Sequence, residues 1–251
     1  MKIGIIGAGY WGPNLIRNFH SIKEVASITV CDFDEERLEY IKSKFPNITT
    51  ELDYKKLLDK NIDAVVVATP VGSHYQIAKE ALLSGKHIWV EKPFTAKSNH
   101  AEELIKIAEE NDLRLFVDHT FLYTGAVRKM KEIISNGELG NIIYFDSVRI
   151  NLGLFQHDVD VIWDLAPHDL AILFHINEER PNAVTANGVD HLNNGLVDVA
   201  YLTLHYNTNF ENEWKIDLDF VLLISQPHFG QIRSKCLTLN PVQGPSLLVP
   251  I

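Results

Sequence analysis

The sequence predicts an α/β chain in which an N-terminal domain with a doubly wound parallel sheet precedes a second α+β domain with an open mixed or antiparallel sheet. Short apolar runs alternate with helical patterns over residues 1–120, as in parallel sheets covered by helices. A G-x-G-x-x-G pattern separates the first apolar run from the first helical one. Beyond residue 142, apolar and polar residues alternate with a period of two, which is typical of antiparallel strands. These observations predict domains over residues 1–120 and 121–251.

The bulk composition is that of an ordinary globular protein. The chain has 251 residues, 46% of them hydrophobic and 22% charged, with a formal net charge of −10. This acidic balance argues against a nucleic-acid-binding or an anionic membrane surface, and no apolar run approaches the roughly 20 residues of a membrane helix. Two cysteines, Cys31 and Cys236, form no C-x-x-C pair and fit a reducing compartment. We therefore expect a cytoplasmic protein.

The first strand and the first helix frame a glycine-rich turn. Residues 2–6 are expected to form the strand and residues 14–19 the start of the helix, with Gly7, Gly9 and Gly12 between them. In this context Gly7 permits a tight turn, Gly9 lets a pyrophosphate approach the backbone, and Gly12 allows the helix to pack closely on the strand. The N–H groups at the start of the helix would then hold the phosphates.

A second strand over residues 26–31 ends at Asp32, 20 residues after Gly12. An acid at this place accepts hydrogen bonds from the adenosine ribose and repels a 2′-phosphate, so the predicted cofactor is NAD. Arg37 keeps NADP open as the less favoured cofactor. The alternative role for Asp32 is to cap the N-terminus of the following helix.

The β-α alternation continues to about residue 120. Expected helices cover residues 35–45, 54–59, 74–84 and 99–111, and expected strands lie near residues 49–50, 64–68, 88–90 and 113–117. The loop after residue 68 contains Thr69, Pro70 and His74. The strand at residues 88–90 ends at Glu91, Lys92 and Pro93, where the proline cannot continue the sheet ladder. Both loops leave the carboxyl ends of parallel strands, the edge at which such sheets bind ligands, although Glu91 and Lys92 could also be a surface ion pair.

The second half begins with an expected helix over residues 126–136 and a long strand over residues 142–152. A helical stretch over residues 161–173 places Asp164 and His168 at i and i+4, on one face. Residues 199–205 have the period of a strand, and residues 213–224 are apolar enough for strands. Residues 227–251, which contain four prolines, are predicted to form a tail of loops.

The motifs Gly7-x-Gly9-x-x-Gly12, Thr69-Pro70 with His74, Glu91-Lys92-Pro93 and Asp164-x-x-x-His168 together resemble the glucose–fructose oxidoreductase / inositol dehydrogenase / rhizopine catabolism (Gfo/Idh/MocA) family. The resemblance runs from residue 1 to about residue 207, and its most specific parts are Glu91-Lys92-Pro93 and the stretch from Trp163 to Asp169. It implies a Rossmann domain followed by an α/β domain with an open sheet. It also implies a cofactor site made of Gly7, Gly9, Tyr10, Trp11, Gly12, Asp32, Thr69, Pro70, His74, Glu91 and Lys92.

The resemblance implies that Lys92 and His168 serve the redox chemistry of an alcohol, and that Asp164 belongs to the same site. His168 is the expected base, because an imidazole with a pKa near 6.5 is mostly neutral at pH 7, and Asp164 would orient its ring or hold a sugar hydroxyl. Lys92 would stabilise the developing alkoxide, or accept the proton itself if burial lowers its pKa. A surface i,i+4 pair is the alternative for Asp164 and His168.

The stretch from Arg149 to Gly153 is most similar to the subgroup that oxidises UDP-N-acetylglucosamine, or its uronic acid, at the sugar C3. Arg149 and Asn151 alternate on one strand and point to the same face, where they would bind a diphosphate or a sugar, or simply face solvent. We therefore expect a sugar or UDP-sugar substrate. A dehydrogenase of inositol or another polyol and a non-catalytic NAD-binding remnant or regulator are the alternatives.

Weaker candidates complete the prediction. Tyr10 and Trp11 would line the cofactor loop or pack against the following helix, and His119 and Tyr123 are minor pocket candidates. No metal is expected, because the group His157, Asp158, Asp160, Asp164 and His168 matches no zinc spacing. Residues 210–251 do not match the family, so a truncation or a shifted reading frame would leave the second domain incomplete. A homo-oligomer is expected if the sheet of that domain is complete enough.

Overall fold

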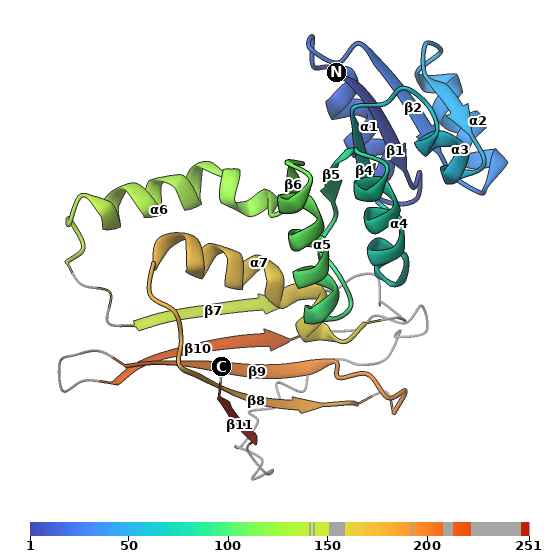
Figure 1. The fold of residues 1–251 in the computed structure, drawn as a ribbon. Helices are drawn as coiled ribbons and strands as arrows, with labels where there is room; N and C mark the ends of the chain where they lie inside the picture. Colours follow the sequence, from blue (N-terminus) through green and yellow to red (C-terminus); the bar gives the residue numbers. More distant parts are fainter. Residues whose placement is uncertain are drawn as a thin grey trace. The chain divides into compact units, whose positions relative to one another are not determined.

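The computed structural model describes residues 1–140, 142, 144–150, 159–191, 193–207, 213–221 and 247–250. The chain divides into two compact units, Met1–Asp118 and His119–Ile251, which we call the first and the second unit and describe separately (Figure 1).

The first unit is built on a sheet of parallel strands in the order β3-β2-β1-β4-β5-β6. This confirms the doubly wound sheet that the sequence predicts. The chain starts at the centre, moves outward through β2 and β3, and returns to β4 beside β1, so the order reverses between β1 and β4. Ligands bind at such a reversal, beyond the carboxyl ends of the strands. The strands are β1 (Lys2–Ile6), β2 (Ser27–Cys31), β3 (Thr49–Glu51), β4 (Ala64–Val67), β5 (His87–Val90) and β6 (Leu115–Val117).

Helices cover both faces of this sheet because its central strands are apolar on both sides. In β4, Val65 and Val67 belong to the core on one face and Val66 to the core on the other, and all three are at most 1% exposed. Apolar side chains of α3, α4 and α5 pack on the first face, and those of α1 and α2 on the second. These helices are α1 (Gly12–His20), α2 (Glu35–Lys44), α3 (Tyr54–Leu58), α4 (Val71–Leu83) and α5 (Ser98–Glu110).

Two element boundaries differ from the prediction for local reasons. Helix α4 begins at Val71 rather than at residue 74, directly after Pro70, whose fixed φ angle suits the residue that enters a helix. Strand β6 begins at Leu115 rather than at residue 113, because the Leu113 N–H donates to the Ala108 carbonyl at the end of α5.

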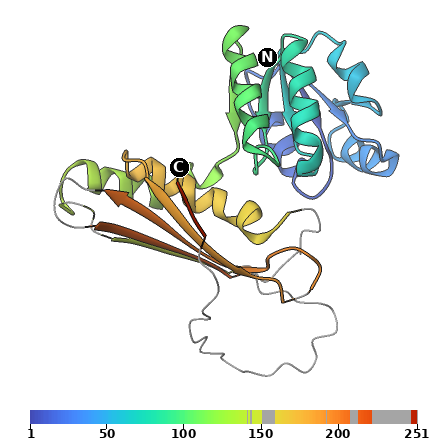
Figure 2. The ribbon, with the colours of Figure 1, turned by 60° about the horizontal axis from the view of Figure 1, so that its bottom comes forward.

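The second unit has a mixed sheet in the order β11-β8-β9-β10-β7, in which only the β10–β7 pair is parallel. This confirms the predicted open mixed sheet. Helices α6 (Gly125–Ser135) and α7 (Val161–Ile176) lie on one side of it (Figure 1 and Figure 2). The remaining elements are the 3-10 helix η1 (Thr120–Tyr123) and the strands β7 (Tyr144–Ile150), β8 (Ala183–Val189), β9 (Val199–Asn207), β10 (Glu213–Val221) and β11 (Leu247–Pro250).

The core of the second unit lies between α7 and the sheet. On β9, the alternate residues Ala200, Leu202 and Leu204 are buried, as the period-two pattern predicts. They form one cluster with Leu165 and Leu173 of α7. The predicted helix over residues 161–173 is therefore confirmed, and its apolar face holds it against the strands.

Two strands of the second unit were not expected. Strand β8 was missed, because its second half, Ala186–Val189, contains asparagine and glycine, which are depleted in strands. The prediction that residues 227–251 form only loops is wrong for β11, which pairs antiparallel with β8. A strand of four residues is too short to show periodicity, and its proline stands at the end of an edge strand, where proline is tolerated.

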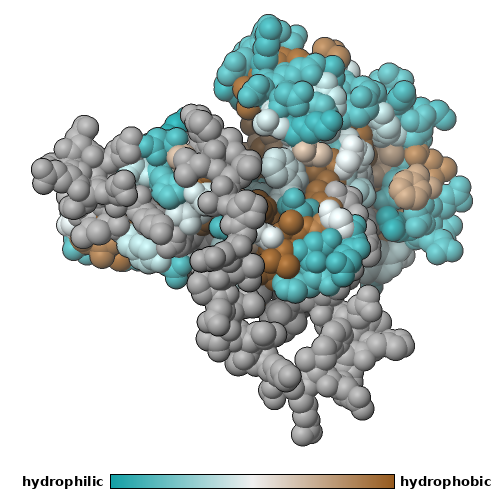
Figure 3. Space-filling view, turned by 90° about the horizontal axis from the view of Figure 1, so that it is seen from below, coloured by the Kyte–Doolittle hydropathy of each residue, from teal (hydrophilic) through white to brown (hydrophobic). Residues whose placement is uncertain are grey.

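Hydrophilic residues cover most of the described surface on the face shown in Figure 3, with hydrophobic patches between them. Among the residues that the structure describes, no helix is both long enough and apolar enough to cross a membrane.

Candidate functional site

Three loops of the first unit meet at the carboxyl edge of the parallel sheet. Backbone hydrogen bonds join successive strand ends: the Ala68 N–H donates to the Ile6 carbonyl at 2.8 Å, and the Glu91 N–H donates to the Val67 carbonyl at 3.0 Å. The glycine loop after β1, the Thr69 loop after β4 and the Glu91–Lys92 loop after β5 therefore lie side by side. We call this edge the rim.

The three glycine positions of the first loop differ in what a side chain there would contact. Gly7 has a φ angle of +104°, and a Cβ atom there would lie 2.5 Å from the Ala68 carbonyl oxygen. A Cβ atom on Gly12 would collide with the Gly7 carbonyl. Gly9 is different, because a Cβ atom there would meet only a terminal nitrogen of Arg37, at 3.6 Å. The backbone at Gly9 is thus open to a ligand.

No acidic or capping side chain from helix α1 itself or from its N-cap residue occupies the N-terminus of this helix. Its N-cap residue, Trp11, makes no side-chain capping bond, and the first turn contains no acidic residue. The positive end of the helix dipole is therefore available for a phosphate. Tyr10 is 82% exposed and Trp11 is 42% exposed, so neither ring is buried against the following helix.

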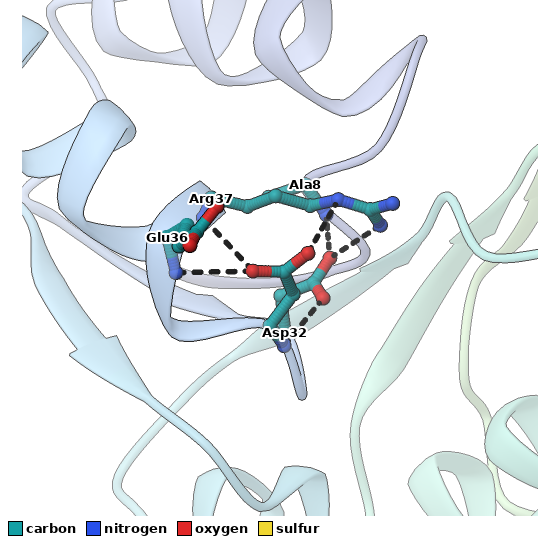
Figure 4. A network of polar contacts seen from close by, with 5 residues as sticks. Ala8, Asp32, Glu36 and Arg37 are labelled. Atoms are coloured by element: carbon teal, nitrogen blue, oxygen red, sulfur yellow. Dashed lines mark hydrogen bonds and ion pairs between the residues drawn. The ribbon is translucent and has the colours of Figure 1, made fainter.

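Asp32 links the end of β2 to the glycine loop (Figure 4). Its carboxylate accepts the Ala8 N–H at 2.7 Å and the Asp34 N–H at 3.0 Å, and Arg37 lies 3.7 Å away. The residue that caps α2 is Asp34, which accepts the Glu36 and Arg37 N–H groups. The alternative that Asp32 caps this helix is therefore wrong. A carboxylate has about four acceptor sites, so Asp32 can still accept a ribose hydroxyl.

These features fit a dinucleotide cofactor. The open backbone at Gly9 and the uncapped start of α1 suit a pyrophosphate, and Asp32 stands at the end of the neighbouring strand, where the ribose would lie.

His74 lies in α4 below the rim and is 1% exposed. Its Nε2 atom is 2.7 Å from the Thr69 carbonyl oxygen, and its Nδ1 atom is 3.0 Å from the Pro93 carbonyl oxygen. Pro70 is exposed, and Thr69 accepts a hydrogen bond from the Ser73 hydroxyl at 2.7 Å. The structure thus places Thr69 and Pro70 in the rim, and His74 behind it as a residue that holds two loops together.

Glu91 and Lys92 follow β5, and Asp118 follows the neighbouring strand β6. Burial, then the charge and the hydrogen bond of Asp118, raise the pKa of the Glu91 carboxyl from 4.5 to about 8, while the charge of Lys92 opposes this shift. Two carboxyl groups that share a hydrogen bond must hold a proton between them. The sequence reasoning missed Asp118, which is 4% exposed. Its position directly after a strand of the same sheet was the available signal.

Helix α7 of the second unit carries Asp164 and His168 on one face. Asp160 caps the helix by accepting the Trp163 N–H at 2.8 Å. Asp164 is buried, at 8% exposure, and His168 is half-buried. The His168 ring makes a T-shaped contact with the Phe121 ring, with 4.7 Å between the ring centroids. The pair is therefore not a freely solvated surface pair.

Arg149 on β7 is bound within the second unit. Its guanidinium makes a two-point ion pair with Asp169, at 2.5 and 3.2 Å, and lies 4.7 Å from the centre of the Phe121 ring. Asp169 also accepts the Ser147 hydroxyl at 2.6 Å. A side chain held in this way can present one edge to a substrate but is not free to move. The sequence reasoning missed Phe121 and Asp169, which are distant from Arg149 along the chain.

The structure gives less information about the remaining predicted site residues. His119 is the N-cap residue of η1 and Tyr123 is its last residue. The Tyr123 ring packs on the Arg128 guanidinium. Asn151, His157 and Asp158 lie outside the described residues. Within the part of the chain that the structure describes, no group of three metal-binding side chains is close enough to hold an ion.

Comparison with known proteins points to one class of enzyme. Residues 1–119 match the family model GFO_IDH_MocA, described as "Oxidoreductase family, NAD-binding Rossmann fold". A relative from Acidithiobacillus ferrooxidans named UDP-N-acetylglucosamine 3-dehydrogenase is 29% identical over 219 residues, which are 83% of this chain and 64% of that protein. A relative from Bacillus subtilis named scyllo-inositol 2-dehydrogenase (NADP(+)) IolW is 28% identical over 226 residues, which are 82% of this chain and 60% of that protein.

A solved structure, myo-inositol 2-dehydrogenase from Lactobacillus plantarum, is similar with a TM-score of 0.80 at 20% identity, over 90% of this chain and 70% of that one. At this identity the similarity shows the fold alone. The chain spans less than two thirds of the length of the two sequence relatives.

Proposed function

Because the chain belongs to the Gfo/Idh/MocA family of oxidoreductases, we propose that it oxidises a secondary hydroxyl of a sugar or sugar nucleotide with a nicotinamide cofactor as the hydride acceptor. The observation that carries the proposal is the rim of the first unit, where the open backbone at Gly9 and the Lys92 loop lie at the same sheet edge. A cofactor and a cationic side chain can meet there.

The substrate class that we propose is a UDP-N-acetylhexosamine oxidised at C3. Its supports are the relative named UDP-N-acetylglucosamine 3-dehydrogenase and the position of Arg149, whose guanidinium is fixed by Asp169 and is 22% exposed. A polyol such as inositol is the second candidate, favoured by the relative named scyllo-inositol 2-dehydrogenase.

NAD is the cofactor that we propose, with NADP less favoured. Asp32 is anchored by two backbone N–H groups close to the glycine loop, so a 2′-phosphate would approach a fixed negative charge. Arg37 is the competing influence, because its side chain is 46% exposed and could turn toward a phosphate. Comparing the Kd values of NAD and NADP by calorimetry tests this, and a tighter NADP complex would overturn it.

In the proposed mechanism, three side chains of this chain act on the substrate hydroxyl. A bound nicotinamide supplies the hydride acceptor. His168 takes the hydroxyl proton on a ring nitrogen, and Asp164, one helical turn earlier, orients the ring or holds a neighbouring hydroxyl. Lys92 donates a hydrogen bond to the reacting oxygen and stabilises its developing negative charge. The alternative is that Lys92 itself accepts the proton.

The test is reduction of NAD, followed by absorbance, with UDP-N-acetylglucosamine, its uronic acid and myo-inositol offered in parallel. We expect turnover with a UDP-sugar, and a loss of about 100-fold or more in His168→Ala and Lys92→Ala. Phe174→Ala, at a position on the same helix that is 47% exposed, is the matched control. NAD binding with no reduction by any of the three substrates would support a non-catalytic NAD-binding protein instead.

We also propose that the exposed face of the second sheet binds a second copy of the chain. The exposed alternate residues of β7 are Tyr144, Asp146, Val148 and Ile150. Three of these four are large hydrophobic side chains that are more than half exposed, and exposed hydrophobic groups of this kind are typical of an interface. Light scattering of the purified chain is the measurement, and a strictly monomeric mass would contradict the proposal.

We propose that the protein is located in the cytoplasm, because Cys31 is a free buried thiol and free thiols are typical of a reducing compartment.

A further inference from the structure

Each ring nitrogen of His74 contacts a backbone carbonyl oxygen. The Nε2 atom lies 2.7 Å from the oxygen of Thr69, in the loop after β4, and the Nδ1 atom lies 3.0 Å from the oxygen of Pro93, in the loop after β5. Both distances are those of direct hydrogen bonds. The ring is 1% exposed, so neither contact is made at a freely solvated edge.

A neutral imidazole cannot satisfy both contacts. It has one N–H donor and one nitrogen with a lone pair, whereas a carbonyl oxygen can only accept. In either neutral tautomer, a nitrogen lone pair would therefore point at a carbonyl lone pair across hydrogen-bonding distance. The imidazolium form has a proton on both nitrogens and donates twice. A buried charge is tolerated where it is hydrogen-bonded and an opposite charge is present, and both N–H donors would be hydrogen-bonded here.

The surroundings of His74 supply negative charge at the rim. The acidic pair Glu91 and Asp118 belongs to the same sheet edge and retains one negative charge while it shares a proton. Along the neighbouring helix, Glu103 is paired with Lys79 at 2.6 Å. The titratable and charged groups on the elements packed around α4 are Glu91 and Lys92 after β5, Asp118 after β6, and His100 and Glu103 on α5.

We propose that His74 is an imidazolium ion at neutral pH and acts as a positioning residue for Lys92. One of its N–H groups holds the carbonyl of Pro93, the residue next to Lys92, and the other holds the Thr69 loop. The ring thereby fixes the Lys92 loop to the cofactor side of the rim. The role toward Lys92 rests on the proposed function, whereas the protonation state does not.

The protonation state is tested by nitrogen-15 NMR of the full chain labelled at histidine. Long-range proton–nitrogen correlation spectra distinguish the imidazolium ring from both neutral tautomers, and the His74→Asn variant assigns the signal. We expect two protonated nitrogens on His74 at pH 7, unchanged when the pH is raised by a unit. A neutral tautomer of His74 at pH 7 would overturn the proposal.

The positioning role is tested separately with His74→Asn and a matched control, His100→Asn. His100 stacks on Tyr75 with 3.8 Å between ring centroids, and its ring makes no described hydrogen bond to either loop. Losing a hydrogen bond from a charged donor weakens a site by about tenfold or more, so NADH affinity should fall by that factor in His74→Asn and stay unchanged in His100→Asn.

The readouts separate the two parts of the inference. Circular dichroism checks that the variants are folded. His74→Gln, whose amide N–H lies one carbon farther from the backbone than that of Asn and can reach one of the two carbonyls, should recover part of the NADH affinity if the bond to Pro93 or Thr69 is what matters. If wild-type protein shows the imidazolium signal and folded His74→Asn keeps full NADH affinity, only the positioning role is overturned. If wild-type protein binds no NADH, the proposed function fails, yet the NMR result still decides the protonation state.

Discussion

At the scale of single residues, the glycines of the first loop serve two different requirements, the packing of the fold and the binding of a ligand. A Cβ atom on Gly12 would meet the backbone of Gly7, which cannot move aside, whereas one on Gly9 would meet only the end of the flexible Arg37 side chain at an ordinary contact distance. A methyl group at Gly12 should therefore disturb the fold, and a methyl group at Gly9 should disturb only what binds above it.

This difference gives a paired prediction. Gly9→Ala should keep the wild-type Tm within about 2 °C and weaken NADH binding at least tenfold, because the new methyl group occupies the approach of the pyrophosphate. Gly12→Ala should lose both NADH binding and about 1–3 kcal/mol of stability through the collision of its methyl group with the Gly7 carbonyl. Thermal unfolding and fluorescence titration check the pair. Equal losses of Tm in the two variants would contradict it.

Glu91 gives the chain a stability that depends on pH. Its pKa is raised from 4.5 to about 8 by burial and by Asp118, so between these values the folded state holds a proton that the unfolded state has released. The free energy of unfolding should therefore fall as the pH rises from about 4.5 to about 8, by at most ~1.4 kcal/mol per pH unit.

The variant Glu91→Gln should flatten this slope, because an amide cannot release the proton. Urea unfolding at several pH values is the measurement, and Glu39→Gln, at an exposed position on α2, is the control that should leave the slope unchanged. A slope that is the same in wild type and Glu91→Gln would show that the shared proton does not contribute to stability.

At the scale of elements, the fold could be predicted wherever periodicity or a motif was strong. Strand β4 and helix α7 are apolar on the faces that the structure buries, and both were predicted. Strand β8 was not, since its partners, not its own residues, make it a strand. Strand β11 was not predicted either, because it is a strand through its pairing with β8.

The candidate site divides along the same line. Lys92, Asp164 and His168 are carried by local motifs that can be recognised in the sequence. Asp118 and the Phe121 ring contribute through contacts that arise only on folding, with Glu91 and with Arg149 and His168. Such partners are set by strand order and helix packing, which no single stretch of sequence encodes.

Helix α7 should owe its place to its buried side. Leu173 is fully buried in the core of the second unit, and the next residue, Phe174, is 47% exposed. Leu173→Ala should cost about 2–5 kcal/mol by leaving a cavity, whereas Phe174→Ala should cost less than about 1 kcal/mol. Chemical unfolding of both variants tests the packing, and a similar cost for the two would mean that α7 is not anchored as described.

At the scale of the whole molecule, the two units should respond differently to a cofactor. The groups that fit a dinucleotide, from Gly7 to Asp32 and in the Thr69 loop, all belong to the first unit. A ligand that binds the native state lowers the population of opened states in the region it contacts. Slower exchange on NADH binding should therefore concentrate in the first unit.

Hydrogen exchange followed by mass spectrometry measures this in the intact chain. With saturating NADH, peptides that contain Gly7–Gly12 and Thr69–His74 should exchange at least tenfold more slowly, because a bound pyrophosphate orders the backbone amides of these loops. Peptides from β9 and β10 (residues 199–207 and 213–221) form the internal control and should be unaffected. Uniform protection across both units would instead mean that the cofactor stabilises the molecule as one cooperative body, and protection confined to the second unit would remove the cofactor from the rim altogether.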